Sequence, residues 1–206
     1  MAKHCTVICA GEVGQIKIPD GSFVICADGG LAHAKARGVT PDLIVGDFDS
    51  LGQIPQGENV RVHPVAKDET DSFLAVRYAL ERGCSEFLIY GGLGGRFDHT
   101  LANVQLLHFL CENGCRGTLV GADGTRVTAI KNGSLTFDAA LSGSIGVFSL
   151  TDESRGVTIK NFKFEAENVT LTNRTSFGAS NEFCGKSGFI CVEDGVLLIT
   201  WKEQTV

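Results

Sequence analysis

Residues 23–30 read FVICADGG and residues 41–50 read PDLIVGDFDS, two short apolar runs that each end in aspartate. Such runs, bounded by polar and turn-forming residues, are typical of buried β-strands. Further strand-like runs occur at Thr6–Ala10, Phe87–Tyr90 and Thr118–Val120, and helical patterns lie between the runs at Leu31–Arg37, Ser72–Arg82 and His99–Asn113. Strands that alternate with helices predict an α/β domain, residues 1–124, whose mostly parallel sheet carries helices on both faces.

The pattern changes after Asp123 and Gly124. Short alternating segments follow at Arg126–Lys131, Gly133–Phe137, Ser144–Leu150, Gly156–Ile159, Asn168–Leu171, Gly188–Val192 and Val196–Trp201. Gly, Asn, Asp and Ser separate them at intervals of about ten residues, which is typical of antiparallel structure. We therefore expect an all-β antiparallel sandwich or barrel over residues 125–206.

Composition excludes several classes of protein. The 206 residues contain 18 Lys plus Arg against 24 Asp plus Glu, a formal charge of −6, whereas nucleic-acid binders usually carry a basic patch. No stretch reaches the ~18 apolar residues of a membrane span, and the first residues lack a secretory signal pattern. We expect the eight cysteines to be free thiols in a reducing cytoplasm. The alternative, a zinc site at His108, Cys111 and Cys115, lacks an evident fourth ligand.

Aspartates stand where the predicted strands end. Asp28 follows the strand at 23–27, and Asp47 and Asp49 follow the strand at 43–45. Asp98 lies beyond a glycine-rich loop after Phe87–Tyr90, and Asp71 precedes the helix at 72–82. Loops beyond the carboxyl ends of parallel strands gather along one edge of the sheet, where ligands bind. The order of these residues predicts that all five carboxylates converge.

Five ionised carboxylates in one cleft repel one another, and a hard divalent cation such as Mg²⁺ removes that conflict. The loop GGLGGRF, residues 91–97, offers backbone N–H groups that can approach a phosphate, and Arg96 adds a planar cation. Together the acidic residues, the glycine loop and the arginine predict a metal–nucleotide site.

Simpler roles exist for each residue. Asp71 or Thr70 can cap the helix that follows, Asp28 can belong to a turn with Gly29-Gly30, and His99 suits a helix entry better than a catalytic base. The chain has no Gly-x-x-x-x-Gly-Lys-Ser/Thr motif, and the glycine loop fails the third glycine of the dinucleotide fingerprint. The missing motif excludes a P-loop kinase, and the incomplete fingerprint argues against a dehydrogenase.

Four strings resemble the thiamine pyrophosphokinase family in order and spacing: ADGG (27–30), PDLIVGDFDS (41–50), KDETD (67–71) and GGLGGRFDH (91–99). The resemblance extends to SNEF (180–183) and covers nearly the whole chain. It implies a catalytic α/β domain, a C-terminal β-sandwich for thiamine binding and dimerisation, and a homodimer with thiamine between the subunits. The implied reaction transfers the pyrophosphoryl group of ATP to the hydroxyl of thiamine, giving thiamine diphosphate and AMP.

The family's site residues carry over onto matching positions. Asp28, Asp47, Asp49 and Asp71 are the expected Mg²⁺ ligands, and Asp71, Asp98 and Arg96 the expected catalytic residues. Expected contacts to nucleotide or thiamine are Gly29, Gly92, Gly94, Gly95, Arg96, Ser180 and Asn181. The loop Asn161–Ala166 departs from the family pattern, and Trp201 lies near a family tryptophan of the last strand but is equally suited to packing at a strand end.

Two rival functions stay open. A pyrophosphokinase that acts on a hydroxymethylpterin resembles this family in fold and acidic motifs, although Ser180-Asn181 and the all-β half favour thiamine. A non-catalytic regulator that binds nucleotide or thiamine is the other rival, and the complete set of acidic residues argues against it.

Overall fold

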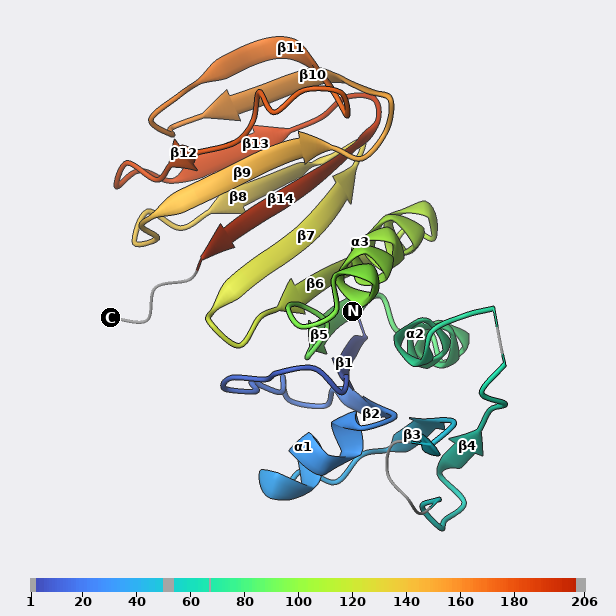
Figure 1. The fold of residues 1–206 in the computed structure, drawn as a ribbon. Helices are drawn as coiled ribbons and strands as arrows, with labels where there is room; N and C mark the ends of the chain where they lie inside the picture. Colours follow the sequence, from blue (N-terminus) through green and yellow to red (C-terminus); the bar gives the residue numbers. More distant parts are fainter. Residues whose placement is uncertain (1–2, 50–53, 67, 203–206) are drawn as a thin grey trace. The chain divides into compact units, whose positions relative to one another are not determined.

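The computed structural model describes residues 3–49, 54–66 and 68–202, whose ribbon is drawn in Figure 1. These residues form three helices with parallel and antiparallel strands, a mixed-sheet structure with a β-rich part. The chain divides into two compact units, Met1–Leu106 with Gly117–Ala122 and Leu107–Arg116 with Asp123–Val206. Ser50 and Lys67, from two of the motif strings, lie outside the described residues.

Strands of the first unit lie in the order β6-β5-β1-β2-β3-β4. Their bounds are β1 His4–Ile8, β2 Phe23–Ala27, β3 Leu43–Gly46, β4 Val60–Val62, β5 Glu86–Tyr90 and β6 Arg116–Val120. The pairs β1–β2, β1–β5, β2–β3 and β3–β4 are all parallel. Because parallel strands end at the same edge, the segments after β2, β3 and β5 start from one side of this sheet.

The helices are α1 Gly30–Ala36, α2 Asp71–Glu81 and α3 Phe97–Glu112. The hydroxyl of Thr70 accepts a hydrogen bond from the Phe73 N–H at 3.3 Å, so Thr70, and not Asp71, caps α2. The helix ends where Gly83 takes a positive φ of 75° and donates its N–H to the Leu80 carbonyl. Helix α3 begins two residues before the expected His99.

An apolar core lies under α1. Ile8, Val24, Cys26, Leu31, Ala34, Ile44 and Phe48 form one buried cluster, drawn from β1, β2, β3, α1 and the residues just after β3. Strands buried in this way have continuous apolar sequences, as FVICA and LIV do.

The second unit contains two sets of antiparallel strands, β12-β9-β14-β7 and β11-β10-β13-β8 (Figure 1). Their bounds are β7 Thr125–Lys131, β8 Ser134–Phe137, β9 Ser144–Ser149, β10 Glu153–Lys160, β11 Ala166–Thr172, β12 Asn181–Glu182, β13 Gly188–Cys191 and β14 Val196–Lys202. Val147 and Ile199 from the first set share a buried cluster with Val157 and Ile190 from the second. The two sets therefore have a common apolar core.

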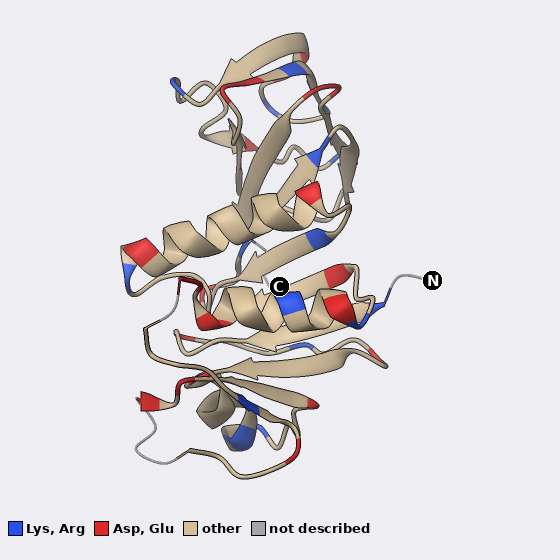
Figure 2. Ribbon diagram, turned by 90° about the vertical axis from the view of Figure 1, so that its right-hand side faces the viewer, with Lys and Arg blue, Asp and Glu red and all other residues tan. Residues whose placement is uncertain are grey.

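Charged residues are distributed along the ribbon of both units, with Lys and Arg interspersed among Asp and Glu (Figure 2). Among the described residues, no helix combines the length and hydrophobicity that crossing a bilayer requires.

Candidate active site

Three aspartates gather at the carboxyl ends of β2 and β3. One carboxylate oxygen from each of Asp28, Asp47 and Asp49 lies within 4.8 Å of the others. Asp28 directly follows β2, and its N–H donates to the Val45 carbonyl of β3 at 2.8 Å. Asp47 directly follows β3, and its Oδ1 accepts the N–H of Asp49 at 3.3 Å. The adjacent parallel strands thus bring together three of the five predicted carboxylates.

The backbone around this trio is held in an unusual conformation. Asp28 has a φ of 45° and Phe48 a φ of 60°, a region that costs free energy for residues other than glycine. Phe48 is 2% exposed and packs in the cluster under α1, so burial of its ring offsets the cost of its φ. The buried Phe48 therefore separates Asp47 and Asp49 in sequence, and both of these aspartates keep some exposure to solvent.

The trio fits a hard divalent cation. Its donor atoms are all carboxylate oxygens, the ligands that Mg²⁺ takes in proteins, and ligands on opposite sides of such an ion are separated by about 4 Å. Asp28 and Asp47 are partly buried and Asp49 is exposed, which leaves one side open to further ligands. Among the described residues this is the one group of three or more His, Cys, Asp or Glu side chains placed to hold a metal ion.

Asp71 is the first residue of α2 and is not a member of that trio. Its Oδ1 is buried, and its charge contributes, after burial and Cys26, to raising the pKa of the Cys9 thiol to about 12. Because Cys9 follows β1, Asp71 lies near the carboxyl end of a third strand of the same sheet. Its role as a metal ligand remains a prediction.

Arg96 and Asp98 pair with each other. Arg96 Nη2 lies 2.6 Å from Asp98 Oδ2, and Nε lies 3.2 Å from Oδ1. The hydrogen bonds from Arg96 hold the pKa of the Asp98 carboxyl below its usual value. Both side chains are exposed, Arg96 within the glycine loop and Asp98 just after it, and Asp98 is not in the group formed by Asp28, Asp47 and Asp49. A neighbouring opposite charge in solvent stabilises Asp98 without a metal.

The glycine loop has a buried base and an open tip. Gly91 and Gly92 are buried, whereas Gly94 and Gly95 are exposed with φ of 81° and 64°. Gly29 occupies the N-cap position of α1. Open N–H groups at the tip, beside Arg96, are suited to a phosphate, but contacts of these glycines with nucleotide remain predictions.

In the second unit, Asn181 is 6% exposed, and its carboxamide bonds both backbone groups of Phe164. Its Nδ2 donates to the Phe164 carbonyl at 2.7 Å, and its Oδ1 accepts the Phe164 N–H at 3.0 Å. Asn181 therefore supports the loop Asn161–Ala166, where the chain departs from the family pattern. Ser180 is exposed, with a φ of 60°.

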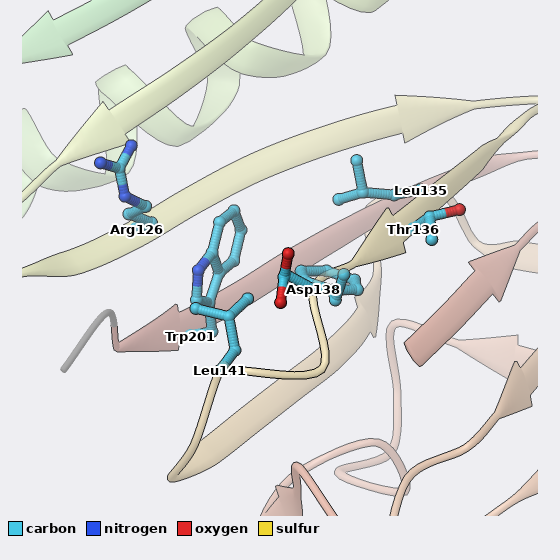
Figure 3. A pocket seen from close by; sticks show the side chains of 7 residues that line it. Arg126, Leu135, Thr136, Asp138, Leu141 and Trp201 are labelled. Carbon is cyan, nitrogen blue, oxygen red and sulfur yellow. The ribbon is translucent and has the colours of Figure 1, made fainter. Parts of the chain in front are cut away.

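A cavity of about 340 Å³ lies beside Trp201 (Figure 3). Its lining comprises Arg126, Leu135, Thr136, Phe137, Asp138, Leu141 and Trp201, from β7, β8, β14 and the segment after β8. The indole lies 5.3 Å from the Phe137 ring in an edge-on arrangement and packs on the apolar core. Trp201 therefore packs at its strand end and also lines a cavity, and its contact with thiamine stays a prediction. Neither Arg126 nor Asp138 belongs to a sequence motif that points to this cavity.

The cysteines do not form a metal centre in the described residues. None of the eight forms a disulfide bond, and five are buried. His108 Nε2 lies 3.5 Å from Glu112 Oε1, and Cys115 Sγ contacts the Asn113 carbonyl. Burial is the main cause of the raised pKa of the Cys111 thiol, which disfavours the thiolate that zinc would require.

Known proteins are similar to this chain over the segment that carries these residues. The sequence model described as "Thiamin pyrophosphokinase, catalytic domain" matches residues 17–119, half of the chain. The chain belongs to the thiamin pyrophosphokinase family. The matched segment includes the three aspartates, Asp71, the glycine loop and the Arg96–Asp98 pair.

Relatives cover most of the chain. It is 25% identical to thiamine pyrophosphokinase from Bacillus subtilis over 182 residues, 85% of each protein. It is 27% identical to thiamin pyrophosphokinase 1 from Caenorhabditis elegans over 161 residues, 73% of this chain and 65% of the relative. The crystal structure of the B. subtilis thiamine pyrophosphokinase superposes with a TM-score of 0.84 at 22% identity, covering 98% of this chain and 100% of that one. The family fold thus extends through both units.

Proposed function

We propose that this protein is a thiamine pyrophosphokinase, which transfers the pyrophosphoryl group of ATP to the hydroxyl of thiamine and releases AMP. The observation that carries the proposal is the convergence of Asp28, Asp47 and Asp49 at the ends of two parallel strands in a chain of this family. A pyrophosphoryl transferase needs a cluster of carboxylates, because its ATP substrate binds as a complex with Mg²⁺ and the carboxylates hold that ion.

Asp28, Asp47 and Asp49 hold Mg²⁺ in this proposal, with Asp71 as a further ligand. When bound by these carboxylates, the ion would neutralise phosphate charge. The donor set supports this assignment, since three carboxylates within 4.8 Å otherwise repel one another.

In the transfer, the thiamine hydroxyl oxygen forms a bond to the β-phosphorus while the bond from that phosphorus to the oxygen bridging to the α-phosphate breaks. AMP leaves with the electron pair, and the hydroxyl proton passes to a carboxylate, Asp71 or Asp98. Arg96 binds the transferring phosphates, and the exposed Gly94 and Gly95 extend that contact through their N–H groups. Gly92 and Gly29 are further contacts to the nucleotide in this proposal. Positioning and electrostatics supply most of the rate enhancement in such transfers.

Thiamine binding belongs to the second unit in this proposal. The first 124 residues are the catalytic α/β domain, a mostly parallel sheet with helices on both faces, and residues 125–206 a β-sandwich. Ser180 and Asn181 line the thiamine side, and Trp201 offers an aromatic face beside its cavity. The active form is a cytoplasmic homodimer whose thiamine sites lie at the subunit interface.

Mass spectrometry of the products from Mg·ATP and thiamine tests the proposal. We expect thiamine diphosphate and AMP in equal amounts, and a hydroxymethylpterin offered as the competing alcohol should remain unmodified. An Asp47→Asn variant serves as the control for contaminating activity. If only the pterin is pyrophosphorylated, thiamine is not the substrate. If no AMP forms with any divalent metal, the protein is a non-catalytic regulator that binds nucleotide or thiamine.

A further inference from the structure

A chain of buried hydrogen bonds connects the start of α2 with the glycine loop through α3. The Ser72 hydroxyl donates to Asn103 Oδ1 at 2.7 Å, and Asn103 Nδ2 donates to the Gly92 carbonyl at 2.9 Å. The Thr70 and Ser72 hydroxyl oxygens are 3.0 Å apart. Since the single proton of Ser72 is directed to Asn103, Thr70 is the donor in that contact.

The side chains that form these hydrogen bonds are buried. Asn103 is 5% exposed and Ser72 is 8% exposed. A buried polar group that loses its hydrogen-bond partner destabilises the fold by its desolvation free energy, so each hydrogen-bonded side chain in this series holds the next one in place.

The residue that Asn103 holds is the base of the glycine loop. A Cβ added at Gly92 would lie 3.2 Å from Asn103 Nδ2 and 3.2 Å from the Leu119 side chain, so the backbone approaches both closely. On the other side, Gly11 donates its N–H to the Gly91 carbonyl at 3.1 Å. The base is therefore fastened on two sides, whereas a Cβ at Gly94 or Gly95 would meet nothing within 4 Å.

The other end of the chain flanks a candidate catalytic carboxylate. Thr70 and Ser72 are the neighbours of Asp71 in sequence, and both take part in the chain of hydrogen bonds. The Thr70 oxygen also accepts the Phe73 N–H, which fixes the first turn of α2. One buried amide thus sets the spacing between the segment that carries Asp71 and the loop that leads to Arg96.

We infer that Asn103 is a positioning residue: through Ser72 and Gly92 it holds the glycine loop in register with the start of α2, and thereby sets the affinity for the nucleotide. Asn103 itself touches no substrate. The inference rests on the proposed function, because it assumes that the glycine loop binds the phosphates of ATP.

Two variants and two controls test this role in the full-length protein. Asn103→Leu removes both hydrogen bonds and keeps the number of side-chain heavy atoms. Gln105→Leu also replaces a side-chain amide with leucine, at an exposed position of α3. Ser72→Ala removes the partner of Asn103, and Ser72→Thr retains the hydroxyl. The measurements are KM for ATP, KM for thiamine, kcat, melting temperature, and amide hydrogen exchange of the peptide that covers residues 91–96.

We expect Asn103→Leu and Ser72→Ala to raise KM for ATP about tenfold, which corresponds to about 1.4 kcal/mol, and to speed exchange in the 91–96 peptide. KM for thiamine should stay unchanged, and Gln105→Leu and Ser72→Thr should resemble the parent. If Asn103→Leu does not fold, the comparison of Ser72→Ala with Ser72→Thr tests the inference by itself.

A merely structural role gives a different result. In that case the melting temperature falls, exchange in the 91–96 peptide stays at the parent rate, and KM for ATP and thiamine change together or not at all; this overturns the inference. The proposed function fails separately, when the parent protein makes no thiamine diphosphate, and hydrogen exchange in the variants still tests whether Asn103 holds the loop.

Discussion

Gly46 and Asp28 meet so closely that a Cβ at position 46 would lie 3.0 Å from the Asp28 Cα. Gly46 is the last residue of β3, and Asp28 is the first residue after β2. This contact brings the two strand ends together and leaves Asp47, the next residue, beside Asp28. The absence of a side chain at position 46 is therefore a condition for the acidic trio.

Gly46→Ala should separate Asp28 from Asp47. The added methyl group meets backbone, which can give way only by shifting the strand end. We expect the affinity for Mn²⁺, measured by electron paramagnetic resonance, to fall about tenfold, the lower end of the effect of disturbing the groups that support metal ligands. Gly133→Ala, where the nearest atom is 3.4 Å away, should bind Mn²⁺ like the parent; equal affinity in both variants would contradict the role of Gly46.

Asp49→Asn should abolish activity and leave the metal-free protein as stable as the parent or more stable. Removing one of three nearby negative charges relieves repulsion when no cation is bound. Thermal melts in the presence of a chelator measure this directly. Clear destabilisation there would show that Asp49 supports the fold and is not a strained metal ligand.

Arg96→Ala should reduce activity about a hundredfold, the scale of losing one group that stabilises transition-state charge, without lowering the melting temperature. The Arg96–Asp98 pair is exposed, and exposed ion pairs add little to stability. Arg77→Ala breaks a comparable exposed pair with Glu69, 2.7 Å apart, and should change neither property. A loss of activity in both variants would indicate a general electrostatic effect.

Maleimide at pH 8 should label Cys184 first in the native protein, because it is the exposed cysteine. Burial raises the pKa of the Cys9 and Cys26 thiols to about 12, so these groups stay protonated and enclosed. The pKa of these thiols is 9 in the unfolded chain, so their contribution to the stability of the fold is complete below pH 9. That contribution to stability is lost as the pH rises toward 12. Peptide mass spectrometry with a denatured control reports the order; early labelling of Cys9 would mean that this core opens.

Trp201→Ala should raise KM for thiamine about tenfold and leave KM for ATP unchanged, since stacking on an aromatic face contributes about 1–3 kcal/mol per ring. Trp201→Phe keeps an aromatic ring against Phe137 and separates lost stacking from lost packing. If both variants bind thiamine like the parent, the cavity beside Trp201 serves another purpose.

Local sequence predicted the elements whose own residues suffice to define them. The apolar runs FVICA and LIV are strands, and Thr70 and Gly83 bound α2 through a hydroxyl cap and a left-handed glycine. Strands β4 and β12 were missed, because β4 has three residues that are not buried and β12 has only two. Strands this short depend on neighbours that lie elsewhere in the sequence.

For the candidate site, the sequence by itself determined that aspartates follow β2 and β3, because chain order puts a residue after a strand whatever the rest of the fold does. Only the tertiary structure decided that Asp28, Asp47 and Asp49 form a trio while Asp98 pairs with Arg96 in solvent. It also decided that Ser72 meets Asn103 across 31 positions of sequence. Spacing along a chain constrains neighbours, whereas contacts between distant side chains depend on how whole strands and helices pack.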